Sequence, residues 1–143
     1  EEMLIMERRA LVVECVHTYY WENDFSCAEV SQRILNELFK ANLSTQLLWA
    51  TFGLNAGRCG LQCGLVEGPL LFMGIYAAKK HIDQGEIRKL CRQYCAEFKA
   101  EFGSMLCSEL RPEGFKRTNP PHLCEARTVE AVVFAIEFIE KHM

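Results

Sequence analysis

Apolar residues recur every three or four positions along most of the chain, which is the spacing of helices with one buried face. Stripes of this kind lie at residues 27–38, 87–102 and 129–139, with shorter helical segments expected around residues 44–52 and before residue 81. The first stripe of the chain consists of Ile5, Val12, Val16 and Tyr19. No segment has the strict alternation of a half-buried strand. The pattern predicts an all-α fold, a bundle of five to six helices.

Several helix ends are marked by residues that favour capping. Ser26 and Glu29 have the spacing of a capping box, in which the Ser hydroxyl and the Glu carboxylate each bind a free backbone amide. Asp83 is expected to open a helix, and Gly103 is expected to end the same helix. These residues therefore fix the expected bounds of two helices.

The one long loop is expected at residues 111–121, which are rich in proline, glycine and charge. Within it, Asn119 followed by Pro120 has the form of an N-cap and the first residue of the last helix. Neither a linker nor an internal repeat divides the chain. The sequence thus predicts a single helical domain over residues 1–143.

Composition and charge exclude some classes of partner. The formal net charge is −3 and no Lys/Arg-rich run is present, so nucleic-acid binding is not expected. The longest strongly apolar stretch, residues 69–78, is far shorter than the roughly 18 residues that a spanning helix needs. The first residues lack the charged-then-apolar order of a signal peptide. We therefore expect a soluble, cytoplasmic protein.

Cysteine is the unusual feature of the composition, with eight residues in 143. Without a secretory signal, cysteines are more often metal ligands or redox thiols than structural disulfides. No Cys-x-x-Cys pair exists, which argues against a zinc ribbon, a thioredoxin-type site and covalently bound haem. Cys59 and Cys63 instead lie four residues apart within a glycine-rich stretch from Gly53 to Gly68, where backbone amides can approach a sulfur closely.

Three cysteines are expected near the starts of helices that lie far apart in the sequence: Cys27, Cys63 and Cys124. A helix N-terminus carries partial positive charge and free amides, which favour the thiolate over the thiol. The thiolate is the form that binds metal or attacks a disulfide. His122, two residues before Cys124, is the one histidine close to a candidate site.

The remaining cysteines fit the core better than a site. Cys91 and Cys95 face the same side of one helix and continue its apolar stripe, which favours packing over ligation. Cys15 lies next to core positions of the first helix and is expected to be structural.

The order of these motifs resembles the C_GCAxxG_C_C family of redox-active proteins. The resemblance covers nearly the whole chain and rests on four segments: Ser26-Cys27-Ala28, Cys63-Gly64 with Gly68, Phe102-Gly103-Ser104 with Cys107, and Cys124 before the final helix. It implies that the signature cysteines are Cys27, Cys63, Cys107 and Cys124. The same helical unit is similar to the cluster-bearing part of split-Soret cytochromes, which implies an iron–sulfur site. Leu65 and Pro69 depart from the family pattern.

These cysteines are compatible with three functions. The first is electron transfer or redox sensing through an iron–sulfur cluster on the four signature thiolates, with Cys59 as an accessory redox thiol. The second is a metal-free thiol–disulfide oxidoreductase in which Cys59 and Cys63 attack and resolve. The third is a structural zinc site on four thiolates. Whether the protein is an enzyme is undecided; the expected partner is an unnamed redox protein, and a homodimer is left open.

Overall fold

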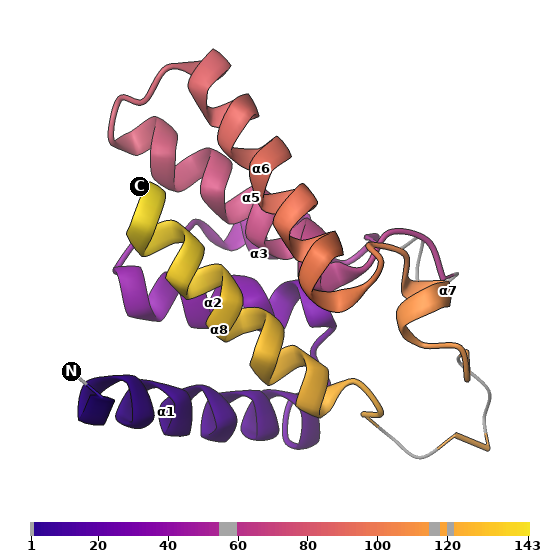
Figure 1. Cartoon of the computed structure of the whole chain (residues 1–143). Helices are drawn as coiled ribbons and strands as arrows, with labels where there is room; N and C mark the ends of the chain where they lie inside the picture. Colours follow the sequence, from indigo (N-terminus) through magenta and orange to yellow (C-terminus); the bar gives the residue numbers. More distant parts are fainter. Residues whose placement is uncertain (1, 55–59, 115–117, 120–121) are drawn as a thin grey trace.

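The computed structural model describes residues 2–54, 60–114, 118–119 and 122–143. Seven helices lie within these ranges (Figure 1), and no strand is found there beyond one isolated bridge between Gln62 and Leu106. The all-α fold is confirmed. The described helices exceed the expected five to six because two of them, α3 and α7, are single turns of five and four residues. The helices are α1 (Glu2–Trp21), α2 (Cys27–Phe39), α3 (Thr45–Trp49), α5 (Gly64–Lys79), α6 (Gln84–Phe102), α7 (Cys107–Leu110) and α8 (Glu125–His142).

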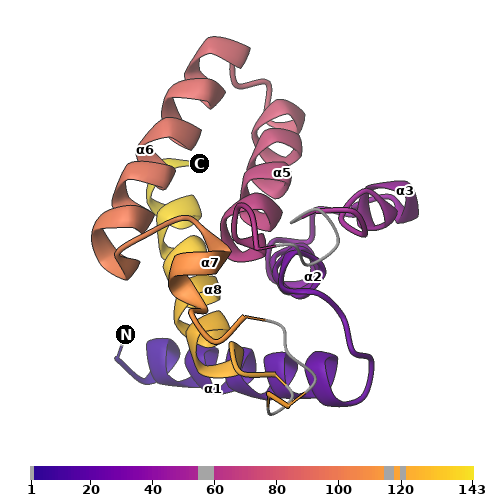
Figure 2. The same cartoon turned by 90° about the vertical axis from the view of Figure 1, so that its right-hand side faces the viewer.

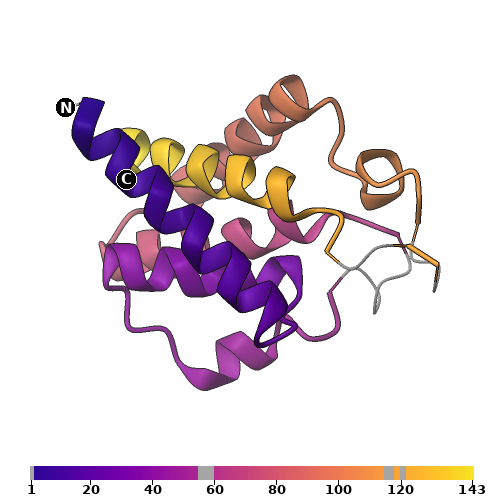
Figure 3. The same cartoon turned by 90° about the horizontal axis from the view of Figure 1, so that it is seen from below.

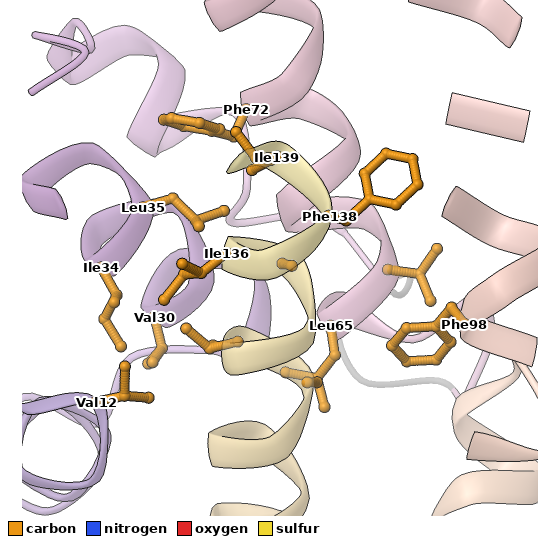
Figure 4. Close-up of a cluster of buried hydrophobic side chains, with 14 of the residues drawn as sticks. Val12, Val30, Ile34, Leu35, Leu65, Phe72, Phe98, Ile136, Phe138 and Ile139 are labelled. Atoms are coloured by element: carbon orange, nitrogen blue, oxygen red, sulfur yellow. The ribbon is translucent and has the colours of Figure 1, made fainter. Parts of the chain in front are cut away.

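The five long helices pack around one apolar cluster. Helix α2 packs mainly against α5, α1 lies against both α8 and α2, and α6 covers the other side of α5 (Figures 2 and 3). Side chains from α1, α2, α5, α6 and α8 meet in this cluster. Figure 4 shows part of it, including Val12, Val30, Leu35, Leu65, Phe72, Ile136 and Ile139.

The predicted caps are found at three helix ends. The Ser26 hydroxyl accepts a hydrogen bond from the amide of Glu29 at 3.3 Å, as predicted. The second bond of the predicted capping box is not found between these two described residues, because the Glu29 carboxylate accepts a hydrogen bond from Arg33 on the next turn instead. The Asp83 carboxylate accepts from the backbone amide two residues later, and Gly103 ends α6 with a left-handed φ of 90°. Local capping chemistry therefore sets these bounds as expected.

The start of the last helix differs from the prediction. Helix α8 begins at Glu125, and Asn119 lies in a bend before it; Pro120 lies outside the described residues. His122 has a φ of 59°, which a right-handed helix cannot include. The left-handed residue keeps the segment before Cys124 out of the helix, so the Asn-Pro pair does not open it.

The buried face of α1 also differs from the prediction. Val12, Val16 and Tyr20 are buried at intervals of four residues, whereas Ile5 is 53% exposed. Tyr19 is half-buried, and its hydroxyl donates to Glu37 at 2.6 Å. The inward side chain near the end of α1 is therefore Tyr20, not Tyr19.

Pro69 lies inside α5, where its missing N–H would leave one carbonyl of the preceding turn without its usual donor. That carbonyl belongs to Leu65, four residues earlier. The hydroxyl of Tyr94 on α6 donates to it at 3.4 Å, and both residues are buried. The neighbouring helix thus replaces the hydrogen bond that the proline removes.

None of the helices among the described residues combines the length and the apolar character that crossing a membrane would require.

Candidate redox site

Each of the four signature cysteines lies at the start of a helix. Cys27 and Cys107 are the first residues of α2 and α7, and Cys63 and Cys124 directly precede α5 and α8. The starts of α2, α5 and α8 point to the same side of the molecule, where α7 also lies (Figure 1). The predicted placement of Cys27, Cys63 and Cys124 near helix starts is confirmed.

Two pairs of these cysteines are brought together. The thiols of Cys27 and Cys124 form a side-chain hydrogen bond. Cys63 lies close enough to Cys107, Cys124 and Cys27 to interact with each of them electrostatically. Cys63 and Cys107 are both buried, with 5% and 6% of their surface exposed.

Backbone hydrogen bonds hold Cys63 beside Cys107. The amide of Cys63 donates to the carbonyl of Met105 at 2.8 Å, and the amide of Cys107 donates to that of Leu61 at 2.7 Å. The amide of Ser108 donates a third hydrogen bond between the two segments, to the carbonyl of Gly60 at 3.2 Å. This short ladder ties the segment before α5 to the segment before α7, although more than 40 residues separate them.

Two glycines bring the start of α5 against the start of α2. A Cβ atom on Gly64 would lie 2.8 Å from the backbone nitrogen of Ala28 and 3.0 Å from the Cβ atom of Cys27. A Cβ atom on Gly68 would lie 2.6 Å from the carbonyl oxygen of Ala28. Real Cβ atoms do not approach backbone so closely, so only glycine fits at these two positions. The spacing of four between them thus seats Cys63 next to Cys27.

Three of the four sulfurs have a hydrogen-bond donor other than a thiol. The Tyr20 hydroxyl donates to Cys27 Sγ at 3.1 Å. The backbone amide of Leu65 donates to the sulfur of Cys63, and the Arg111 guanidinium donates to that of Cys124. Donors aimed at sulfur stabilise negative charge on it, whether the thiolate is free or bound to metal.

The thiols differ strongly in acidity. The hydrogen bond from Cys27 lowers the pKa of Cys124 to about 6, with the help of the positive charges of Arg111 and Arg127 and against the effect of burial. The same hydrogen bond, together with burial, raises the pKa of Cys27 well above its usual value. The pair therefore holds one proton, on Cys27, beside a thiolate at Cys124. Burial raises the pKa of Cys63 to about 12, which the amide of Leu65 partly offsets.

A family model described as "Putative redox-active protein (C_GCAxxG_C_C)" matches residues 25–138. The chain belongs to the C_GCAxxG_C_C family. No curated protein and no solved structure matches the chain. The departure of this C_GCAxxG_C_C protein from the pattern at position 65 is accommodated by the core, where Leu65 is fully buried.

The sequence did not point to three residues that contact or face the sulfurs: Tyr20, Arg111 and Arg127. Tyr20 lies four residues after Val16, but Tyr19 fits the same helical stripe at a spacing of three, so spacing alone does not decide between them. Arg111 acts on Cys124 and not on the nearer Cys107, so no local spacing indicates it. Arg127 follows Cys124 by three residues, which brings a positive charge one helical turn from that helix-start thiol. That spacing is a usable signal in this C_GCAxxG_C_C protein.

The other cysteines fall outside the site. Cys15, Cys91 and Cys95 are half-buried and pack against the apolar cluster, and burial raises the pKa of each thiol. Cys59, which the sequence assigned as the partner of Cys63 and as an accessory thiol, lies outside the described residues, so its role stays a prediction.

Within the described ranges, no group of three or more His, Cys, Asp or Glu side chains is arranged to hold a metal ion. The described thiols instead form the two neighbouring pairs given above.

We expect replacement of Cys15 by alanine to leave metal content and the reactivity of the other thiols unchanged. The side chain packs on the edge of the core, away from the four signature cysteines, and its loss should cost about 1 kcal/mol of unfolding free energy. Urea unfolding and metal analysis of the purified variant would check both points. Loss of bound metal in Cys15→Ala would contradict the division between structural and site cysteines.

Proposed function

We propose that this C_GCAxxG_C_C protein transfers or senses electrons through an iron–sulfur cluster held by the thiolates of Cys27, Cys63, Cys107 and Cys124. The observation that carries the proposal is the set of donors aimed at the sulfurs from three different elements: the hydroxyl of Tyr20, the amide of Leu65 and the guanidinium of Arg111. Hydrogen bonds of this kind to ligand sulfurs are a main way in which proteins set the potential of a cluster.

The residues present fit such a group in their chemistry. Four cysteine thiolates are the usual ligand set of [2Fe–2S] and [4Fe–4S] centres, and burial of Cys63 and Cys107 would keep water from two of the ligands. When bound, the cluster would supply one-electron chemistry. Ligation requires thiolates, so Cys27 and Cys63, which hold their protons at neutral pH, would release them, whereas Cys124 is already deprotonated.

The test is anaerobic purification followed by visible spectroscopy and analysis of iron, sulfide and zinc. We expect a brown protein that contains iron and acid-labile sulfide. Cys63→Ser should weaken cluster binding by at least about 100-fold, because losing a ligand costs at least as much as losing a residue that supports one. Cys95→Ser is the matched control, since Cys95 is a half-buried helical cysteine outside the site.

Each other outcome of this test would contradict the proposal. Full iron retention in Cys63→Ser would show that this residue is not a ligand. A colourless wild-type protein with stoichiometric zinc would replace the cluster by a structural zinc site. A colourless protein without metal would leave reversible thiol–disulfide exchange as the function.

A second function, reversible disulfide exchange, is favoured by the contact between Cys27 and Cys124. The Cys124 thiolate would attack one sulfur of a low-molecular-weight disulfide, so that one thiolate leaves. Cys27 would then pass its proton to the thiolate released in the first step and attack Cys124 Sγ, which releases the second thiolate and forms the Cys27–Cys124 disulfide. The pair loses two electrons and the small disulfide gains them. The pairing of Cys59 with Cys63 that the sequence suggested stays a prediction, because Cys59 lies outside the described residues.

A further inference from the structure

Tyr20 places a buried hydroxyl between the candidate site and helix α8. Its oxygen lies 3.1 Å from Cys27 Sγ and 2.7 Å from Thr128 Oγ1. Only 4% of Tyr20 is exposed, and Thr128 is fully buried. Tyr20 belongs to α1 and precedes residues 25–138, so the family motif does not include it.

The direction of these hydrogen bonds follows from the number of protons. A phenol has one O–H, and Tyr20 donates it to Cys27 Sγ. The Thr128 hydroxyl must then be the donor in its own contact with Tyr20, because the phenol has no second proton to give. The result is a chain of donors from Thr128 through Tyr20 to Cys27, in which each hydrogen bond polarises the next.

The ring of Tyr20 is held in place independently of this chain. It stacks on the imidazole of His122, with ring centroids 5.0 Å apart and an interplanar angle of 17°. His122 also contacts the ring of Trp21 edge-on at 4.8 Å. Because packing fixes the ring, removing only the hydroxyl should change the hydrogen bond to sulfur without moving the side chain.

We propose that Tyr20 is a positioning residue that stabilises negative charge on Cys27 Sγ and thereby raises the reduction potential of the site. The inference rests on the proposed redox function, in either of its two forms. In the reduced, metal-free pair the negative charge of Cys124 is shared through the hydrogen bond that Cys27 donates to it, and a hydrogen bond accepted by Cys27 Sγ strengthens that sharing. It therefore favours the reduced pair over the disulfide, since a disulfide sulfur is the weaker acceptor. The same bond to a ligand sulfur favours the more negative, reduced state of a cluster. Both forms predict a shift of the same sign.

The test compares Tyr20→Phe with Tyr19→Phe in the full chain. Phenylalanine keeps the ring that stacks on His122, and Tyr19 is the matched control because its hydroxyl donates to Glu37, away from the sulfurs. Metal-free proteins are equilibrated in glutathione buffers, and the Cys27–Cys124 disulfide is quantified by peptide mass spectrometry. We expect Tyr20→Phe to shift the equilibrium about tenfold toward the disulfide, a change of about −30 mV. Tyr19→Phe should match the wild type.

A second arm measures the midpoint potential of iron-loaded protein by a spectroscopic redox titration. Tyr20→Phe should lower it, and Thr128→Val should lower it in the same direction by a smaller amount, because Thr128 acts through Tyr20. Unchanged potentials in both arms, with a folded Tyr20→Phe protein by circular dichroism, would overturn the inference alone. A wild-type protein that neither binds iron nor forms the disulfide would overturn the proposed function, and the inference with it.

Discussion

Replacement of Gly68 by alanine is expected to destabilise the protein by about 1–3 kcal/mol, although alanine is the better helix former. The added methyl would lie 2.6 Å from the carbonyl oxygen and 3.0 Å from the Cα atom of Ala28. These are backbone atoms inside α2, so no side chain can move aside to make room. Helix α5 must shift away from α2, and this costs more than the gain of at most about 1 kcal/mol in helix propensity.

Gly74 is the matched control for this change because it lies in the same helix with no atom within 4 Å of an added Cβ. Gly74→Ala should therefore stabilise the protein by up to about 1 kcal/mol, opposite in sign to Gly68→Ala. Urea unfolding followed by circular dichroism measures both. Equal effects of the two substitutions would show that propensity, and not the approach of α5 to α2, determines the outcome.

The helix content and most helix ends follow from short-range features that a sequence displays directly. The Ser26 hydroxyl reaches an amide three residues away, and the Gly103 backbone adopts a left-handed φ that other residues rarely adopt. Such features need no information about the rest of the fold. For the same reason, the cysteines at the starts of α2, α5 and α8 could be placed from the sequence.

The features of the fold and the site that could not be predicted from the sequence depend on contacts between distant segments. The predicted start of α8 is wrong because His122 has a left-handed backbone conformation there. Its ring stacks on that of Tyr20, which lies about 100 residues earlier in the chain. The choice of Tyr20 over Tyr19 depends on how α1 is rotated against α8. The pairing of Cys27 with Cys124 likewise requires both helix starts to be placed in space. None of these is encoded in local spacing.

The glycines at 64 and 68 show a further limit. The expected reason for the glycines of residues 53–68 is that backbone amides can approach a sulfur closely there. Neither is among the glycines with a positive φ; both lie within α5 and are required by close helix packing. The same residue type thus serves a different physical purpose, which only the partner helix reveals.

In the reduced, metal-free protein we expect Cys124 to be alkylated by iodoacetamide far faster than Cys63 at pH 7. With a pKa near 6, Cys124 is about 90% thiolate at this pH, whereas Cys63, with a pKa near 12, is about 0.001% thiolate. A thiolate of lower pKa is also less nucleophilic, by roughly 500-fold over this difference. The difference in thiolate fraction is larger than the difference in nucleophilicity. The alkylation rate of Cys124 should therefore exceed that of Cys63 by of the order of 100-fold before the burial of Cys63 is counted.

The pH dependence separates the cause of this reactivity from simple exposure. The alkylation rate of Cys124 should rise with pH through about 6 and level off near neutrality, because the lowered pKa leaves little thiol to ionise above that range. In Cys27→Ala the hydrogen bond that contributes most to this shift is lost, so the midpoint should move up toward the usual thiol value. Peptide mass spectrometry resolves each cysteine, and Cys95 serves as an internal reference whose pKa burial raises. If Cys124 instead titrates like Cys95 in the wild type, or if Cys27→Ala leaves its midpoint in place, Cys27 does not hold Cys124 as a thiolate and the exchange mechanism built on that pair is wrong.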